Sequence, residues 1–211
     1  MTTTSPGPSG RTAARWLPLL LPALALTACT AEEPEAGWEA TVYYTAVESF
    51  HDGAPVEVTG CPVLECEDGD DLLGAYPEDF VQAVEDEGTG RITSGDRAGE
   101  YLNWSYDTGY WLDTEPRNSH GDPLRPFVSA AADPEVLPEG TTLRITDCGD
   151  AEDVEAAVCE AIQDAEWTIE DEFTPGLGGD RHIDLYLGEE TGPDFTESPW
   201  YTTLTNARIE T

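Results

Sequence analysis

Alternating apolar and polar positions predict a mainly β domain that begins near Trp38. Strand-forming Val and Tyr fill Ala40 to Thr45, and Val56 to Thr59 is a second short candidate. Two later strands are expected over 142–146 and over 183–187, each with apolar residues at alternate positions. Gly and Pro interrupt almost every run between them, which favours many short strands joined by turns.

Three further segments complete the predicted elements. Glu78 to Glu85 and Ala151 to Ala165 carry apolar side chains at helical spacing, and Asp150 is a candidate N-terminal cap of the second helix. The stretch from Tyr101 to Leu112 is rich in Trp and Tyr with a Gly inside it, which indicates a hairpin. The expected domain, 38–211, is therefore mainly β with one or two short helices.

The amino-terminal residues have the pattern of an export signal. Two arginines precede an apolar run from Trp16 to Ala28, and the first acidic residue is Glu32. The run is too short to span a bilayer comfortably, and it ends in small residues directly before Cys29. We therefore expect a secretory signal peptide over residues 1–28.

The Leu26-Thr27-Ala28-Cys29 sequence resembles the lipobox of bacterial lipoproteins. The resemblance implies cleavage before Cys29 and lipid attachment to its sulfur, so that the mature protein is anchored to the outer face of the cell membrane. An ordinary signal peptide cleaved nearby is the alternative, and export follows from both. The acidic residues 29–37 then form a tether between membrane and domain.

The charge balance excludes one class of partner. The 211 residues include 44 Asp and Glu against 9 basic residues, all Arg, for a formal charge of −35. Nucleic acid is held by clustered basic side chains and would be repelled by such a surface. Six Trp, eight Tyr and five Phe argue for a folded core and against disorder.

Four cysteines remain once Cys29 is set aside. Cys61, Cys66, Cys148 and Cys159 allow two disulfides, and in an exported chain we expect Cys61–Cys66 and Cys148–Cys159, although three connectivities are possible. A zinc site is the weaker alternative, because the spacings do not match zinc-finger geometry and no His lies close in sequence.

The carboxy-terminal third carries the most informative motifs. Val128-Ser129-Ala130-Ala131-Ala132-Asp133-Pro134 is followed by Leu137-Pro138-Glu139-Gly140-Thr141, then by acids near Asp171, a Gly-rich loop, and Ile183-Asp184-Leu185-Tyr186. This arrangement resembles the three-aspartate (3D) domain, and is similar to the carboxy-terminal part of membrane-bound lytic transglycosylase A and to small cell-wall lytic enzymes. The resemblance covers roughly residues 125–190.

The resemblance implies a six-stranded double-psi β-barrel of the barwin and expansin type that acts on the glycan strands of peptidoglycan. Asp133, Asp171 and Asp184 match the three family aspartates. Asp171 would protonate the oxygen between N-acetylmuramic acid and N-acetylglucosamine and then take the proton of the muramic 6-hydroxyl, giving a 1,6-anhydro product. Asp133 and Asp184 would position and tune it. Turn-capping and strand hydrogen bonding are the structural alternatives for these two.

The chain departs from the family pattern in two places. Four residues from Glu172 to Pro175 separate Asp171 from Gly176, where the family has a Gly pair almost directly after its second aspartate. A small loop insertion, replacement of Asp171 by Glu172, or loss of catalysis would each explain this. Residues 61–122 have no counterpart in a minimal domain and are expected to form an insertion that lines or covers the groove.

Candidate substrate-binding residues are Trp104, Tyr110, His182 and Gly176. Sugar rings stack on aromatic faces, although most aromatics of a small barrel fill its core. No metal-ligand spacing, phosphate loop or nucleophile elbow is found, so no cofactor is implied. Two functions follow: a lipid-anchored lytic transglycosylase, with hydrolysis as its chemical variant, and a non-catalytic, expansin-like wall-binding protein.

Overall fold

The computed structural model describes residues 37–150 and 154–211, together with the first two residues of the chain. The described residues from Gly37 onward form one compact unit. The predicted signal peptide, Cys29 and nearly all of the tether lie outside the described residues. No helix among the described residues is long and apolar enough to cross a bilayer.

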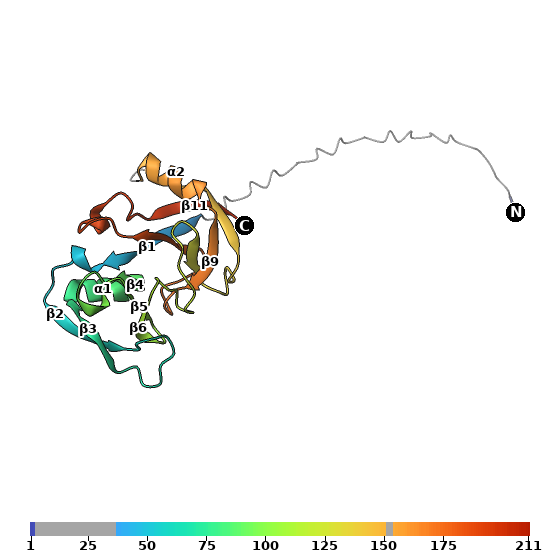
Figure 1. Cartoon of the computed structure of the whole chain (residues 1–211). Helices are drawn as coiled ribbons and strands as arrows, with labels where there is room; N and C mark the ends of the chain where they lie inside the picture. Colours follow the sequence, from blue (N-terminus) through green and yellow to red (C-terminus); the bar gives the residue numbers. More distant parts are fainter. Residues whose placement is uncertain (3–36, 151–153) are drawn as a thin grey trace. The chain divides into compact units, whose positions relative to one another are not determined.

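Eleven strands and two α-helices make the described domain mainly β (Figure 1). The strands are β1 (Trp38–Val47), β2 (Pro55–Gly60), β3 (Asp71–Pro77), β4 (Thr89–Arg91), β5 (Tyr101–Ser105), β6 (Gly109–Asp113), β7 (Ser129–Ala132), β8 (Thr142–Asp147), β9 (Trp167–Glu172), β10 (His182–Glu189) and β11 (Leu204–Glu210). The helices are α1 (Glu78–Glu87) and α2 (Ala156–Asp164), and three short 3-10 turns lie at Glu48–Phe50, Gly95–Arg97 and Phe195–Glu197.

Six of these strands close into a mixed barrel. They follow the order β10-β7-β9-β8-β11-β1, and β1 pairs with β10 to complete the ring. The β1–β10 and β7–β9 pairs are parallel, and the other pairs are antiparallel. This closed six-stranded barrel agrees with the predicted double-psi fold.

The alternation that predicted strands also fills the core. In β8, Leu143 and Ile145 are buried while the residues beside them are exposed. Trp167 and Ile183, from β9 and β10, are fully buried in the same apolar cluster. Burial of one such large side chain stabilises a fold by about 2 kcal/mol, so these alternating positions hold the barrel closed.

Residues 48–128, between β1 and β7, supply no barrel strand. Within them β4 pairs with the end of β1 and continues into β5 and β6, while β2 and β3 form a separate hairpin. Helix α1 packs against both groups of strands (Figure 1). The segment 61–122, predicted to be an insertion, falls inside this stretch.

Both predicted disulfides are present. Cys61 pairs with Cys66, and Cys148 pairs with Cys159, which joins the end of β8 to α2. All four thiols are therefore consumed, and the alternative zinc site has no cysteine ligands.

The start of the second helix differs from the prediction. Helix α2 begins at Ala156 with Glu155 before it, so Asp150 is not its cap. Instead the Asp150 carboxylate accepts a hydrogen bond from Asn206, which ties the loop after β8 to β11. The part of the predicted helix over residues 151–153 lies outside the described residues.

Candidate active site

The strand register brings two of the three predicted acids, Asp171 and Asp184, into one row. Thr41 on β1 pairs with Asp184 on β10, Asp184 pairs with Ala131 on β7, and Ala131 pairs with Asp171 on β9. Directly paired residues of neighbouring strands point to the same face of a sheet. The small Ala131 side chain between the two aspartates leaves open space above the row.

A cavity of about 390 Å³ lies over this row, and all four of these residues line it. The segment between β1 and β7 provides the facing walls. They come from the end of α1, from the turn between β5 and β6, and from the loop after β6. Ring residues Phe173 and His182, stacked with centroids 4.5 Å apart, contribute from the β9–β10 loop and the start of β10.

Asp171 is surrounded by hydrogen-bond donors. Its Oδ1 accepts from the Ser119 amide at 3.0 Å, from the Ser119 hydroxyl at 2.7 Å and from the Glu172 amide at 2.9 Å. The Tyr43 hydroxyl donates to Oδ2 at 3.5 Å. Burial raises the pKa of Asp171, while the Ser119 and Glu172 donors oppose that rise by stabilising its carboxylate form.

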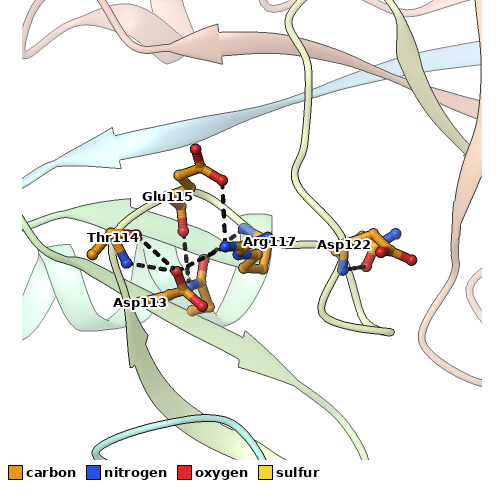
Figure 2. Close-up of polar contacts among 7 residues, drawn as sticks. Asp113, Thr114, Glu115, Arg117 and Asp122 are labelled. Carbon is orange, nitrogen blue, oxygen red and sulfur yellow. Dashed lines mark hydrogen bonds and ion pairs between the residues drawn. The ribbon is translucent and has the colours of Figure 1, made fainter.

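The loop that presents Ser119 is held by its own polar contacts (Figure 2). Arg117 forms ion pairs with Asp113 at 3.0 Å and Glu115 at 3.3 Å. The Arg117 amide donates to the Asn103 side chain on β5, at 3.0 Å. The next residue, Asn118, donates through its side-chain amide to the carbonyl of Glu170, directly before Asp171. These hydrogen bonds hold the loop in place beside Asp171.

Asp184 has fewer donors. Its Oδ1 accepts from the Thr41 hydroxyl at 2.8 Å, and the Leu185 amide is a further donor. Burial, the largest cause, and the neighbouring negative charge of Asp171 raise the pKa of Asp184 to about 7, against the two donors. Near neutral pH Asp184 therefore exists partly in the protonated form, as a general acid requires.

A third carboxyl, Glu87, lies at the end of α1 on the cavity wall. It is 8% exposed, and it accepts hydrogen bonds from the Tyr44 amide and the Tyr201 hydroxyl, each at 3.2 Å. Burial raises the pKa of Glu87 to about 8, with a further contribution from Asp184. Gly88 then ends the helix in the left-handed conformation, at φ +85°, which favours Gly.

The cavity is strongly acidic. Among the described residues that line it, Arg117 and His182 are the basic side chains. Seven carboxyls face them, from Glu85, Asp86, Glu87, Asp107, Asp171, Glu172 and Asp184. Such a site disfavours polyanions and suits a ligand that is neutral at the point of contact.

Four of the seven candidate catalytic and substrate-binding residues come together in this cavity: Asp171, Asp184, Trp104 and His182. The His182 ring contacts the Thr41 hydroxyl through Nε2 at 2.9 Å and the Leu177 carbonyl through Nδ1 at 3.2 Å. Trp104 is partly buried on β5.

The other three candidates do not line the cavity. Asp133 follows β7 and caps its own turn, because its Oδ1 accepts from the Glu135 amide at 3.0 Å. Tyr110 packs against the core, and its hydroxyl donates to the Val81 carbonyl of α1 at 3.5 Å. Gly176 is exposed in the β9–β10 loop with φ +92°, so it shapes the turn whose neighbours reach the cavity.

Five cavity residues had no signal in the sequence: Thr41, Glu87, Ser105, Arg117 and Ser119. Ser105 Oγ and Arg117 Nε are buried atoms without a hydrogen-bond partner in the described part of the chain. Unpaired buried donors are costly, so at a cavity wall they are candidates to bind a ligand. Only the three-dimensional register shows that these residues belong to the site.

Comparisons with known proteins give the fold. No protein-family model and no curated protein sequence matches the chain. It is similar to the crystal structure of E. coli MltA with bound chitohexaose, at 15% identity and a TM-score of 0.51, over 81% of this chain and 70% of that one. It is also similar to the membrane-bound lytic murein transglycosylase from Agrobacterium tumefaciens, at 11% identity and a TM-score of 0.53, over 82% and 72%.

The predicted resemblance to membrane-bound lytic transglycosylase A is thus confirmed for the fold. The described domain has a barrel like that of these lytic transglycosylases. The closer assignment to the three-aspartate domain stays a prediction, as do the roles of the individual acids.

Proposed function

We propose that this chain cleaves the glycan strands of peptidoglycan between N-acetylmuramic acid and N-acetylglucosamine, with Asp184 as the general acid. One observation carries the proposal. A carboxyl whose pKa is raised to about 7 lies in the cavity of a barrel like that of lytic transglycosylases. Perturbed carboxyls in a cavity are typical of acid–base sites.

The contacts favour Asp184 over Asp171 as the proton donor. Three hydrogen bonds to one oxygen of Asp171 stabilise its ionised form, whereas one hydroxyl and one amide serve Asp184. A carboxyl group that accepts many hydrogen bonds ionises at a lower pH than one that accepts few. Its negative charge then raises the pKa of a neighbouring acid and keeps that acid protonated. Asp171 is then the charged residue that tunes Asp184, which exchanges the roles expected from the sequence.

The reaction needs one carboxyl that acts twice. Asp184 gives its proton to the glycosidic oxygen as the bond from that oxygen to the anomeric carbon of the muramic residue breaks. The Asp184 carboxylate then takes the proton of the muramic 6-hydroxyl as its oxygen bonds to the same carbon. The product is a 1,6-anhydro ring, no water is consumed, and Asp184 ends protonated again.

Several cavity groups suit a sugar ligand. Trp104 offers an aromatic face, and Ser105 and Arg117 line the same cavity with polar side chains that suit hydroxyl or acetamido oxygens. The neighbour from E. coli was solved with chitohexaose bound, which supports a glycan as the class of ligand. Of the three family aspartates, Asp133 has no part in this proposal, because its carboxylate caps a turn.

The proposed location is outside the cytoplasmic membrane, with a lipid anchor at Cys29. Disulfides persist in oxidising compartments, and the two of this domain support export. The non-catalytic wall-binding alternative is less favoured, because a carboxyl that stays protonated near neutral pH is typical of acid–base catalysis and is not required for binding.

Release of dye from labelled peptidoglycan tests the proposal, with the chain lacking residues 1–29. We expect Asp184→Asn to lower the rate by about 10²–10⁴-fold, the range typical of a lost general acid. Asp171→Asn should reduce it less, and Asp180→Asn, an exposed acid of the neighbouring loop, is the matched control. Full activity of Asp184→Asn with loss in Asp171→Asn would restore Asp171 as the acid. An inactive wild-type domain that still pellets with the wall would make the protein a wall-binding one.

A further inference from the structure

A continuous chain of hydrogen bonds connects Asp184 to the rim of the cavity. Asp184 Oδ1 lies 2.8 Å from the Thr41 hydroxyl oxygen, and that oxygen lies 2.9 Å from His182 Nε2. The other ring nitrogen, Nδ1, lies 3.2 Å from the Leu177 carbonyl oxygen in the β9–β10 loop. Parallel pairing of β1 with β10 places Thr41 directly opposite Asp184 and so creates this chain.

The number of protons limits how this chain can be arranged. A carbonyl oxygen only accepts, so Nδ1 of His182 must carry a proton to bond Leu177. A neutral ring then has a lone pair on Nε2, and this lone pair takes the single proton of the Thr41 hydroxyl. Thr41 can in turn accept from Asp184 only if Asp184 is protonated. The remaining acceptor of the hydroxyl, the Ile183 carbonyl, is farther away at 3.4 Å.

Ionisation of Asp184 reverses the two bonds of the Thr41 hydroxyl, whereas the bond from His182 to the Leu177 carbonyl cannot reverse, because a carbonyl oxygen only accepts. The carboxylate now accepts from the Thr41 hydroxyl, whose proton is no longer available to His182. The facing lone pairs of Nε2 and the Thr41 oxygen repel each other unless the ring places its own proton on Nε2. His182 therefore has two neutral tautomers, each of which fits one orientation of the Thr41 hydroxyl, and the tautomer with its proton on Nε2 gives up the bond to the Leu177 carbonyl.

We propose that the Thr41 hydroxyl is a two-position proton switch, which donates to His182 while Asp184 is protonated and turns to Asp184 when that carboxyl loses its proton. The catalytic meaning of this inference rests on the proposed function, in which Asp184 is the acid. The switch itself is a property of the free protein.

In the reaction the switch serves both steps. While Asp184 is protonated, His182 holds the Thr41 proton away from the carboxyl, so the Thr41 hydroxyl does not favour ionisation of Asp184. As the proton passes to the glycosidic oxygen, the Thr41 hydroxyl turns and donates to the new carboxylate. This bond is made only as charge develops, which is the kind of contact that accelerates a step. Thr41 and His182 are positioning residues in this scheme.

Other ionisable groups face the two ends of the switch. Asp184 interacts electrostatically with Asp171 of β9, Glu87 at the end of α1, Tyr43 of β1 and Tyr201 near β11. At the other end, Glu39 of β1 lies 3.8 Å from His182 Nε2, which is beyond hydrogen-bond distance. Asp171 and Glu87 thus shift the pH at which the switch turns, whereas the Thr41 hydroxyl decides its direction.

The tautomer of His182 is a direct readout. The full mature chain is labelled with ¹⁵N-histidine, and long-range ¹H–¹⁵N spectra are recorded from pH 5 to pH 9. Three histidines give few signals, and His182→Gln assigns the one of interest. We expect neutral His182 to carry its proton on Nδ1 while Asp184 is protonated, and on Nε2 after Asp184 ionises. The Asp184 carboxyl is followed by its own ¹³C signal.

Three variants separate the switch from a merely structural contact. Thr41→Val removes the hydroxyl at nearly constant side-chain shape. In this variant we expect the tautomer of His182 to no longer follow the charge of Asp184. Thr41→Ser keeps the hydroxyl and should keep the tautomer change. In Asp184→Asn the side-chain amide donates to Thr41 permanently, so the ring should keep its proton on Nδ1 at every pH at which it is neutral. Glu39→Gln, which changes a nearby charge outside the chain of bonds, should leave the change intact.

One tautomer at all pH values in the wild type, an imidazolium that persists while Asp184 titrates, or a tautomer change that survives Thr41→Val would each overturn the proposal. A separate measurement, the release of peptidoglycan fragments, tests the proposed function. A wild-type domain that shows the tautomer change but releases no peptidoglycan fragments would contradict the function and leave the switch in place.

Discussion

Replacement of Asp184 by Asn should stabilise the protein at alkaline pH while it removes activity. In the folded state burial raises the pKa of Asp184 to about 7, against 3.8 for an unperturbed carboxyl. The folded state therefore binds the proton more tightly than the unfolded chain does. Stability is greatest below the unfolded pKa and is lost as pH rises toward 7. Asn keeps a hydrogen bond to Thr41 and cannot ionise, so it avoids this loss.

The size of the effect follows from the shift. About three pKa units correspond to roughly 4 kcal/mol of unfolding free energy once Asp184 is fully ionised, at 1.4 kcal/mol per unit. Asp184 partly faces the cavity, where water and salt weaken the penalty, so we expect a gain of about 2 kcal/mol at pH 8. At pH 5 the carboxyl of the folded protein is still mostly protonated, and the gain should fall below about 1 kcal/mol.

Urea unfolding followed by Trp fluorescence at pH 5 and pH 8 measures this difference. The matched control is Asp180→Asn, which alters an exposed carboxyl and should change neither value. A variant Asp184→Asn that is no more stable than wild type at pH 8, or that gains equally at both pH values, would refute the assignment of Asp184 as a buried, protonated acid.

Three further predictions concern the surroundings of the site. Ser119→Ala removes a 2.7 Å donor to Asp171 and should cost about 1–2 kcal/mol at pH 8 in urea unfolding, and an unchanged midpoint would contradict this. Loss of the Cys148–Cys159 bridge in the double Ser variant should lower stability by about 2–3 kcal/mol, measured in the same way. Asp107→Asn at the rim should lower KM for peptidoglycan a few-fold at low salt, and the gain should vanish near 1 M salt, where the Debye length is about 3 Å. An effect that persists at high salt would exclude charge repulsion as its cause.

Strand-forming residues and alternation were sufficient to predict β10, which carries Asp184, but not β9, which carries Asp171. β1, β8 and β10 lie where the period of two indicated strands, because each buries an apolar set on at least one face. The second helix was predicted too early. Its expected cap, Asp150, bonds Asn206 of a strand more than fifty residues away in sequence, and no local pattern reveals such a contact.

The composition of the site was only partly predictable. The resemblance pointed to Asp171 and Asp184, but their roles depend on donors such as Ser119 and Thr41, which arrive from distant segments. Glu87 was one acid among 44 in the sequence, and only its burial at the end of α1 distinguishes it. Tyr110 belongs to an aromatic cluster that suggested sugar binding, but its ring packs against the hydrophobic core.

The masses of the fragments released from purified peptidoglycan test the central claim most directly. The account predicts fragments with 1,6-anhydro-muramic ends from the wild-type domain and none from Asp184→Asn. Reducing ends in place of anhydro ends would show that water attacks, with a second carboxyl such as Glu87 or Asp171 as its base. Anhydro ends that persist in Asp184→Asn would contradict the account.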